Sequence, residues 1–155
     1  MDFLLELFYG IITNKVLLAG VLSWTVAQVL KVIIHAIVNK SLDITRLVGD
    51  GGMPSGHSAT VSAVATMCGL TCGTASPEFA IAAILAIITC HDAMHSRMEI
   101  GKQASVLNTL IKDMAKGRPD DEALLQELVG HTPSQVTVGI TLGICIGCLF
   151  YSLTR

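Results

Sequence analysis

Charged and aromatic residues are scarce in this chain of 155 residues. Asp, Glu, Lys and Arg make up 14% of it, aromatic residues make up 5%, and the formal net charge is -2. A nucleic-acid-binding surface needs a basic patch or stripe. The sequence contains no basic run, so we expect no nucleic-acid partner.

Cysteine forms no pattern typical of a disulfide scaffold or a zinc site. The five cysteines lie in or beside apolar blocks, and the Cys145-x-x-Cys148 pair falls inside an expected spanning helix rather than on a zinc-binding loop. We interpret them as small residues that pack against neighbouring helices. They are Cys68, Cys72, Cys90, Cys145 and Cys148.

A basic start is also missing, because no positively charged side chain precedes Lys15. Secretory signals begin with a positively charged region. We therefore expect residues 1-155 to be the mature protein.

Hydrophobic residues, in contrast, make up 52% of the chain, and its mean hydropathy is +0.64. About 20 apolar residues are needed to cross the hydrocarbon core of a bilayer. The apolar blocks predict an all-α, multi-pass membrane helix bundle in a single integral membrane domain. We expect about four spanning helices, at residues 16-38, 57-73, 77-95 and 134-153. The apolar stretch 3-13 is too short to cross alone, and its placement stays open.

Two amphipathic patterns lie between the third and fourth expected spans. They predict short surface helices at about 101-116 and 119-130, the second of which starts at Pro119 with acidic residues and ends at Gly130. We expect both to fold against the membrane domain, because about 35 residues are too few for an independent core.

The fourth expected span carries Gly139, Gly143 and Gly147 on one face. This spacing lets the backbone of another helix approach closely. The partner is either a helix of the same chain or a second copy, so a homo-oligomer through this face is one expectation.

Positive charges are divided unevenly between the two ends of the predicted bundle. With four spans, the segments 39-56 and 96-133 share one side and hold seven Lys and Arg residues, whereas the other side holds Lys15 and Arg155. The positive-inside rule places the first side in the cytoplasm, at a cell membrane.

Residues 51-60, Gly-Gly-Met-Pro-Ser-Gly-His-Ser-Ala-Thr, form a glycine-rich polar turn that leads into an apolar helix. Free backbone amides at a helix start, beside glycines that admit a ligand, form an anion site. His57 lies where its imidazole can exchange a proton with that anion. The segment therefore predicts phosphate chemistry at a membrane surface.

Other polar residues are expected at the same membrane depth. His91 and Asp92 lie at the end of the third expected span, Arg97 follows it, and Lys31 lies about two turns inside an apolar helix. A lysine in that position either faces a polar cavity or partner, or extends its ammonium to the interface. Polar clusters that converge at one depth predict a composite site.

The segment Pro54-Ser55-Gly56-His57 resembles the central motif of the superfamily of type 2 phosphatidic acid phosphatases and vanadium haloperoxidases. The full run 51-60 resembles the small divergent membrane branch of that superfamily. The resemblance covers roughly residues 24 to 147. Further matches to the branch are Asp92-Ala93 followed by Arg97, Gly101-Lys102-Gln103-Ala104 with Leu107-Asn108, and Leu128-Val129-Gly130-His131-Thr132-Pro133.

The resemblance implies a phosphate site in which the first and third motifs of the superfamily are only partly present. In the first motif, Lys40 and Arg46 are one residue too close together and Leu47 replaces a proline. In the third motif, Gln103 occupies the position of the superfamily's nucleophilic histidine, and Leu107 that of its orienting aspartate. An amide cannot attack phosphorus as imidazole does, so the phosphate-holding residues carry over better than the bond-breaking ones.

Three mechanisms remain open. In the first, His57 is itself the nucleophile and is oriented by Asp92 or Asp50, while cations neutralise the phosphoryl oxygens. In the second, Asp92, His57 and either His91 or His95 hold a divalent cation that positions water. In the third, the protein binds a phosphorylated lipid without cleaving it.

Three further residues of the matched segments have two interpretations each. His131 either interacts with the end of the helix before it or replaces the lost nucleophile. Gln103 and Asn108 hydrogen-bond within the surface helices or to the site loop, or they contact the substrate directly.

The preferred interpretation is a phosphatase-like hydrolase that acts on a phosphate or diphosphate monoester of a lipid and needs no cofactor unless a divalent cation takes part. The alternative is a non-catalytic module that binds or transports phospholipid headgroups. The assigned residues are His57 and Asp92 as catalytic groups; Lys31, Lys40, Arg46, Ser55, Gly56, Arg97 and Lys102 as phosphate ligands; and Asp50, Gln103, Asn108 and His131 as possible additions.

Overall fold

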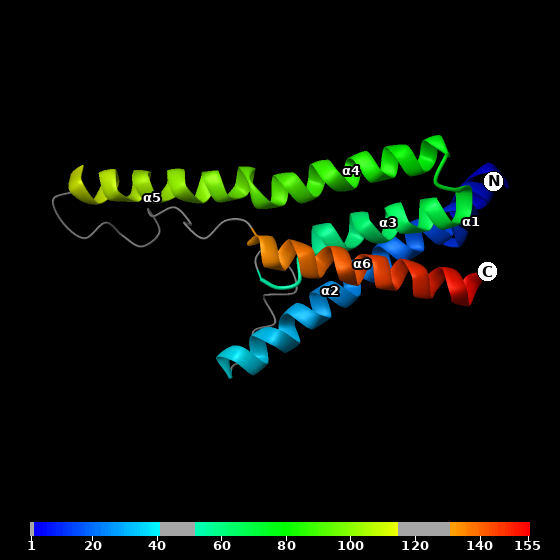
Figure 1. Cartoon of the computed structure of the whole chain (residues 1–155), viewed down its shortest axis with the longest axis horizontal. Coiled ribbons are helices and arrows are strands. Elements are labelled where there is room, and N and C mark those ends of the chain that lie inside the picture. The colour runs from blue at the N-terminus through cyan, green and yellow to red at the C-terminus, as the bar shows by residue number, and fades with distance from the viewer. Residues whose placement is uncertain (1, 41–51, 115–130) are drawn as a thin grey trace.

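The structure, a computed structural model, describes residues 2-40, 52-114 and 131-155, with the side chains of residues 2, 96-98 and 112-114 excepted. Its secondary structure within these ranges is entirely helical (Figure 1). The predicted all-α membrane bundle is therefore confirmed. The helices are α1 (Asp2–Thr13), α2 (Lys15–Asn39), α3 (Gly56–Cys72), α4 (Pro77–Met94), α5 (Ser96–Met114) and α6 (Pro133–Thr154).

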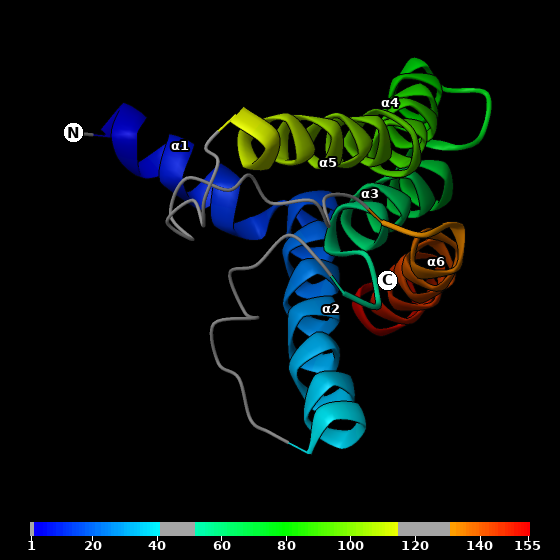
Figure 2. The same cartoon turned by 90° about the vertical axis from the view of Figure 1, so that its left-hand side faces the viewer.

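Helix α3 is the centre of the bundle and contacts α2, α4 and α6. Its inner residues are mostly small, and Ala59, Ala63 and Met67 are fully buried. Small residues let helix backbones approach closely, and the Ser23 hydroxyl of α2 donates a hydrogen bond of 2.9 Å to the carbonyl oxygen of Ala59. Figure 2 shows that α2 crosses α3 and α6 and that the C-terminal half of α2 extends past them.

The glycine face of α6 packs against α3 of the same chain. A Cβ atom added at Gly139 would lie 2.6 Å from the carbonyl oxygen of Ser55, and one added at Gly147 would lie 2.9 Å from Cβ of Thr66. At Gly143 the added atom would overlap the carbonyl oxygen of Ala59. The partner of this face is thus inside the chain, and a homo-oligomer would need another surface.

Three helices within the described residues are long and apolar enough to cross a membrane: α2, α6 and the stretch Pro77–Ile111, which begins with α4. Helix α3 has 17 residues, at the lower limit of about 17 for a spanning helix, and it is covered by the three longer ones. The outer face of α4 is formed by exposed large apolar side chains, which a lipid environment accommodates. They are Ile81, Ile84, Leu85, Ile87 and Ile88.

The remaining helices lie at the ends of the bundle. Helix α1 contacts only α2 among the described helices, and its apolar side chains are exposed. Helix α5 begins directly after α4 and continues away from the bundle (Figure 1), with α4 as its one contacting helix within the described part of the chain. It contains most of the predicted surface helix 101-116, whereas the one predicted at 119-130 lies outside the described residues.

The contact between α3 and α6 predicts a large effect of adding one methyl group. We expect Gly143→Ala to lower the free energy of unfolding by about 1–3 kcal/mol, because the new atom meets backbone atoms that cannot rotate away. Gly10→Ala is the matched control, since nothing lies within 4 Å of its added Cβ. Thermal unfolding in detergent measures both. Equal melting temperatures for the two variants would contradict this packing.

Candidate functional site

The segment Pro54-Ser55-Gly56-His57 forms the start of α3. Ser55 is the N-cap residue: its side-chain oxygen accepts hydrogen bonds from the backbone N–H of Ser58 at 3.4 Å and from the Ser58 hydroxyl at 3.0 Å. Because Ser55 is fully buried, its hydroxyl caps the helix instead of facing solvent. His57, in the first turn, is exposed. At this helix start, the N–H groups of Ser58 and Ala59 are thus bonded to Ser55, and one imidazole is exposed.

Two backbone hydrogen bonds join three separated segments at this end of the bundle. The N–H of Ser55 donates to the carbonyl oxygen of Gln135 at 3.1 Å, which links the loop before α3 to the first turn of α6. The N–H of His131 donates to the carbonyl oxygen of Ala93 at 3.1 Å, which links the end of α4 to the segment before α6. The segments that carry His57, Asp92 and His131 are thereby held together.

A small apolar cluster lies beneath this junction. It consists of Cys90 and Ala93 of α4 and Val136 of α6, with Val61 of α3 packed against it. Val61 lies one turn after His57, and Ala93 directly follows Asp92, whose side chain is exposed. The cluster therefore holds His57 and Asp92 at the same end of the bundle.

His131 is 3% exposed, and its ring lies in a defined hydrogen-bonding arrangement. Its Nδ1 atom lies 3.1 Å from Oε1 of Gln135, which also accepts a hydrogen bond of 3.1 Å from the N–H of Thr132. Because Oε1 is an acceptor, Nδ1 of a neutral His131 carries the hydrogen. Gln135 was absent from the sequence-based assignment, although Thr132-x-x-Gln135 fits the capping-box pattern that the structure forms.

Helix α2 forms the other wall of the site. Lys31 is 4% exposed, and a Cβ atom added at Gly52 would lie 3.1 Å from its Cγ atom. Gly52 also has a φ of 101°, which favours glycine. Gly56 lies against the next turn of α2, where an added Cβ would meet Trp24 at 3.5 Å and Gln28 at 3.9 Å. The loop before α3 therefore runs along α2 from Lys31 to Gln28.

Gln28 is a second residue that the sequence-based assignment lacked. It is 7% exposed, and its Oε1 atom is buried without a hydrogen-bond partner among the described residues. The signal was present in the sequence as a glutamine one turn before Lys31 in an apolar helix, since polar residues in such helices commonly mark functional sites.

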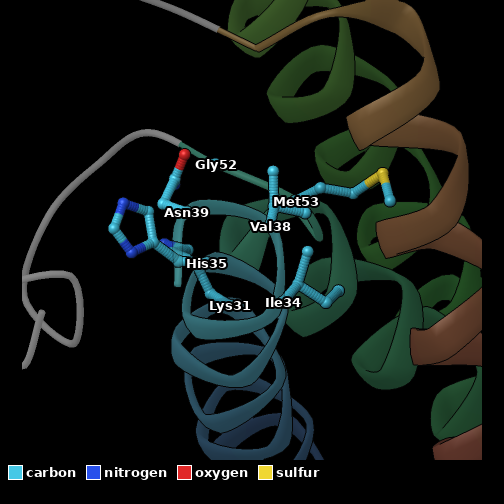
Figure 3. Close-up of a pocket in the computed structure, with 7 residues that line it drawn as sticks. All are labelled: Lys31, Ile34, His35, Val38, Asn39, Gly52 and Met53. Atoms are coloured by element: carbon cyan, nitrogen blue, oxygen red, sulfur yellow. The ribbon is translucent and has the colours of Figure 1, made fainter. Parts of the chain in front are cut away.

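A cavity of about 160 Å³ lies between the C-terminal half of α2 and the loop residues Gly52 and Met53 (Figure 3). His35 and Asn39 lie on one side of it, and the apolar side chains lie on the other. The lining residues are Lys31, Ile34, His35, Val38, Asn39, Gly52 and Met53.

Several predicted ligands are not brought to this site by any described contact. Lys40 is the C-cap residue of α2, nine positions beyond Lys31 and so roughly 13 Å farther along the helix axis. Lys102 and Gln103 are exposed on α5, where the Lys102 ammonium pairs with Glu99 at 2.6 Å. Asn108 is buried on the same helix.

Arg46 and Asp50 lie outside the described residues, and the side chain of Arg97 is also outside the described part of the structure. The described residues also contain no group of three or more His, Cys, Asp or Glu side chains that could hold a metal ion. His91 and His95 are exposed and stack on each other with ring centroids 5.1 Å apart.

Comparison with known proteins agrees with the resemblance seen in the sequence. The profile of the family described as "Divergent PAP2 family" matches residues 12–146. The chain is 40% identical over 147 residues to a Bacillus subtilis (strain 168) protein named "Uncharacterized membrane protein YuiD". The alignment covers 88% of this chain and 93% of that protein. No solved structure matches the chain.

The double role of Gln135 predicts that its side chain stabilises the start of α6 and the preceding segment, which His131 joins to α4. We expect Gln135→Ala to lower the free energy of unfolding by about 1–2 kcal/mol, since it removes the acceptor for Thr132 N–H and for His131 Nδ1. Hydrogen exchange of the amides of His131, Thr132, Ser134 and Gln135 should then be faster. Thr141→Ala, an exposed change in the same helix, is the control. Unchanged exchange in Gln135→Ala would refute the capping role.

Proposed function

The chain belongs to the divergent PAP2 family, and from this membership we propose that it is a membrane phosphatase-like protein that hydrolyses a phosphate or diphosphate monoester of a lipid. The junction at the start of α3 is the main support. There, two backbone hydrogen bonds join the segments of His57, Asp92 and His131 beside a helix N-terminus. Such a helix start attracts the phosphoryl group, and the imidazoles supply proton transfer or nucleophilic attack.

In the proposed mechanism, His57 is the nucleophile. A nitrogen of its imidazole attacks phosphorus, an N–P bond forms, and the P–O bond to the lipid breaks while the leaving oxygen takes a proton from water. A second water then cleaves the N–P bond, which releases phosphate and restores His57. The amides at the start of α3 stabilise the charge that develops on the phosphoryl oxygens, and Asp92 orients the imidazole.

A lipid is the proposed substrate class because the site lies at the end of apolar helices. The exposed apolar side chains of α4 and α2 begin within a few residues of Asp92 and Lys31. An acyl or prenyl chain can lie along these faces while its headgroup reaches the site. The tail then contributes binding energy without taking part in the chemistry.

The second candidate is a module that binds or transports a phospholipid headgroup without cleaving it. The position of Gln103 supports this candidate, because α5 contacts only α4 among the described helices. Residue 103 is a glutamine, which is not a nucleophile, and no described contact of α5 brings it near His57. In this function the helix start and Lys31 hold the anionic headgroup as a binding site only.

Phosphate release by the purified protein in detergent tests the proposal. We expect release from phosphatidic acid, phosphatidylglycerophosphate or a prenyl diphosphate, and a fall of roughly 10²-fold or more in His57→Ala, because the attacking group is lost. Asp92→Asn should also lower the rate. Thr141→Ala is the control, since Thr141 is exposed on α6 and has no assigned role at the site.

The outcomes separate the candidates. Release that does not depend on His57 would overturn the site assignment. No release from any of the lipids, with saturable headgroup binding, would favour the binding module. Loss of activity with a chelator and recovery with a divalent cation would favour the metal mechanism.

We also propose that the protein is a multi-pass protein of the cell membrane with the site in the cytoplasm. Cys72 is exposed at the end of α3 opposite His57, and a membrane-impermeant maleimide should label it from outside intact cells when the other cysteines are replaced. A cysteine introduced by Ser134→Cys, at the site end, should react only after the cells are opened. The reverse pattern would contradict the orientation.

A further inference from the structure

Helix α2 carries a polar stripe in its otherwise apolar C-terminal half. Gln28, Lys31, His35 and Asn39 are spaced by three, four and four residues, which places them on one face of the helix. The loop before α3 lies along this face, with Gly56 beside Gln28 and Gly52 beside Lys31. Polar groups in a membrane helix are costly, and they persist where they line a ligand site or pathway.

Two atoms of the stripe lack hydrogen-bond partners among the described residues. They are Oε1 of Gln28 and Nδ1 of His35, and both are buried. A buried polar atom without a partner destabilises the protein, and such an atom calls for a specific explanation. The two atoms lie on either side of Lys31, so a ligand on this face would meet one of them at each end.

The cavity at the His35 end has the size and chemistry for a phosphate group. Its volume of about 160 Å³ is well above the roughly 10–15 Å³ that one water needs by a comparable measure. Lys31 is the charged side chain of the described lining, and no described carboxylate lines the cavity. Ile34, Val38 and Met53 form the opposite side (Figure 3), where the carbon atoms of a headgroup linker would lie.

The stripe also has the length of a headgroup with two phosphates. Gln28 and His35 are seven positions apart, which is roughly 10 Å along the helix axis. Lys31 lies between them and is within reach of both ends. A ligand with one phosphate can occupy the start of α3 or the cavity, but not both.

We infer that the cavity formed by Lys31, His35, Asn39 and Gly52 binds a second phosphate group of the same lipid headgroup whose first phosphate lies at the start of α3. This inference rests on the proposed function, which places the first phosphate beside His57. His35 supplies a hydrogen bond to the second phosphate once its imidazole turns into the cavity, and Lys31 supplies positive charge between the two groups. The substrate class is thereby narrowed to lipids with two phosphates in the headgroup.

Binding measurements with two matched lipids test the inference. Dioleoyl phosphatidic acid carries one phosphate, and dioleoyl phosphatidylglycerophosphate carries two. We expect the parent protein to bind the second lipid at least about tenfold more tightly, the effect of a hydrogen bond to a charged group. His35→Ala should remove this preference and leave the affinity for phosphatidic acid within about twofold, which also shows that the variant is folded.

A second variant and a soluble arm complete the experiment. His35→Gln keeps a hydrogen-bond donor and should retain part of the preference, whereas Thr141→Ala, an exposed change on α6, should retain all of it. Glycerol 1,3-bisphosphate and glycerol 3-phosphate test the same recognition without a lipid: a His35-dependent preference for the bisphosphate supports the subsite and shows that the free headgroup suffices. A preference for the lipid alone supports it and shows that the lipid tail is needed.

Three results would overturn the inference. The parent protein could show no preference for the lipid with two phosphates, the preference could survive in His35→Ala, or that variant could lose affinity for both lipids equally. Phosphate release measured on the same samples separates the two proposals. If release depends on His57 while His35→Ala keeps the preference, the subsite is wrong and the hydrolase stands. If the preference depends on His35 and no lipid is hydrolysed, the subsite stands and the hydrolase is wrong.

Discussion

The close approach of α3 and α6 is the constraint on which the rest of the structure depends. Added Cβ atoms at the glycines of α6 would meet Ser55, Ser62 and Thr66 at 2.6 to 2.9 Å, so only hydrogen fits on that side of α6. This approach brings the first turn of α6 to the loop before α3, where the N–H of Ser55 finds its acceptor at Gln135. The start of α3 is therefore held in place by packing along the length of that helix.

The polar groups of the site are held at the ends and edges of this packed core. Helix α3 buries its small face against three neighbours, and its first turn leaves His57 exposed. Helix α2 crosses the bundle, so its N-terminal half packs on α3 while its C-terminal half carries the polar stripe from Gln28 to Asn39. Two buried polar atoms on this face, Oε1 of Gln28 and Nδ1 of His35, have no hydrogen-bond partner among the described residues, which lowers the stability of the protein.

Much of the fold could be predicted because the apolar runs are long and separated by polar or glycine-rich turns. The helical class follows from them, and the resemblance of residues 51-60 to a divergent phosphatase branch agrees with the family match. The site was harder to predict. Ser55 looks like a phosphate ligand in the sequence, yet it caps α3 and is buried. Lys102 and Gln103 belong to matched segments, yet they lie on α5, which contacts α4 alone among the described helices.

The sequence by itself determined the helices, the glycine face and the chemical groups available for phosphate, because hydrophobic periodicity and local capping depend on neighbouring residues. Only the tertiary structure decided which groups meet. It paired the glycine face with α3 of the same chain, joined His131 to Ala93 and Gln135, and laid Gly52 on Lys31. These contacts depend on helix crossing and on the volume of side chains far apart in the sequence, which no local pattern specifies.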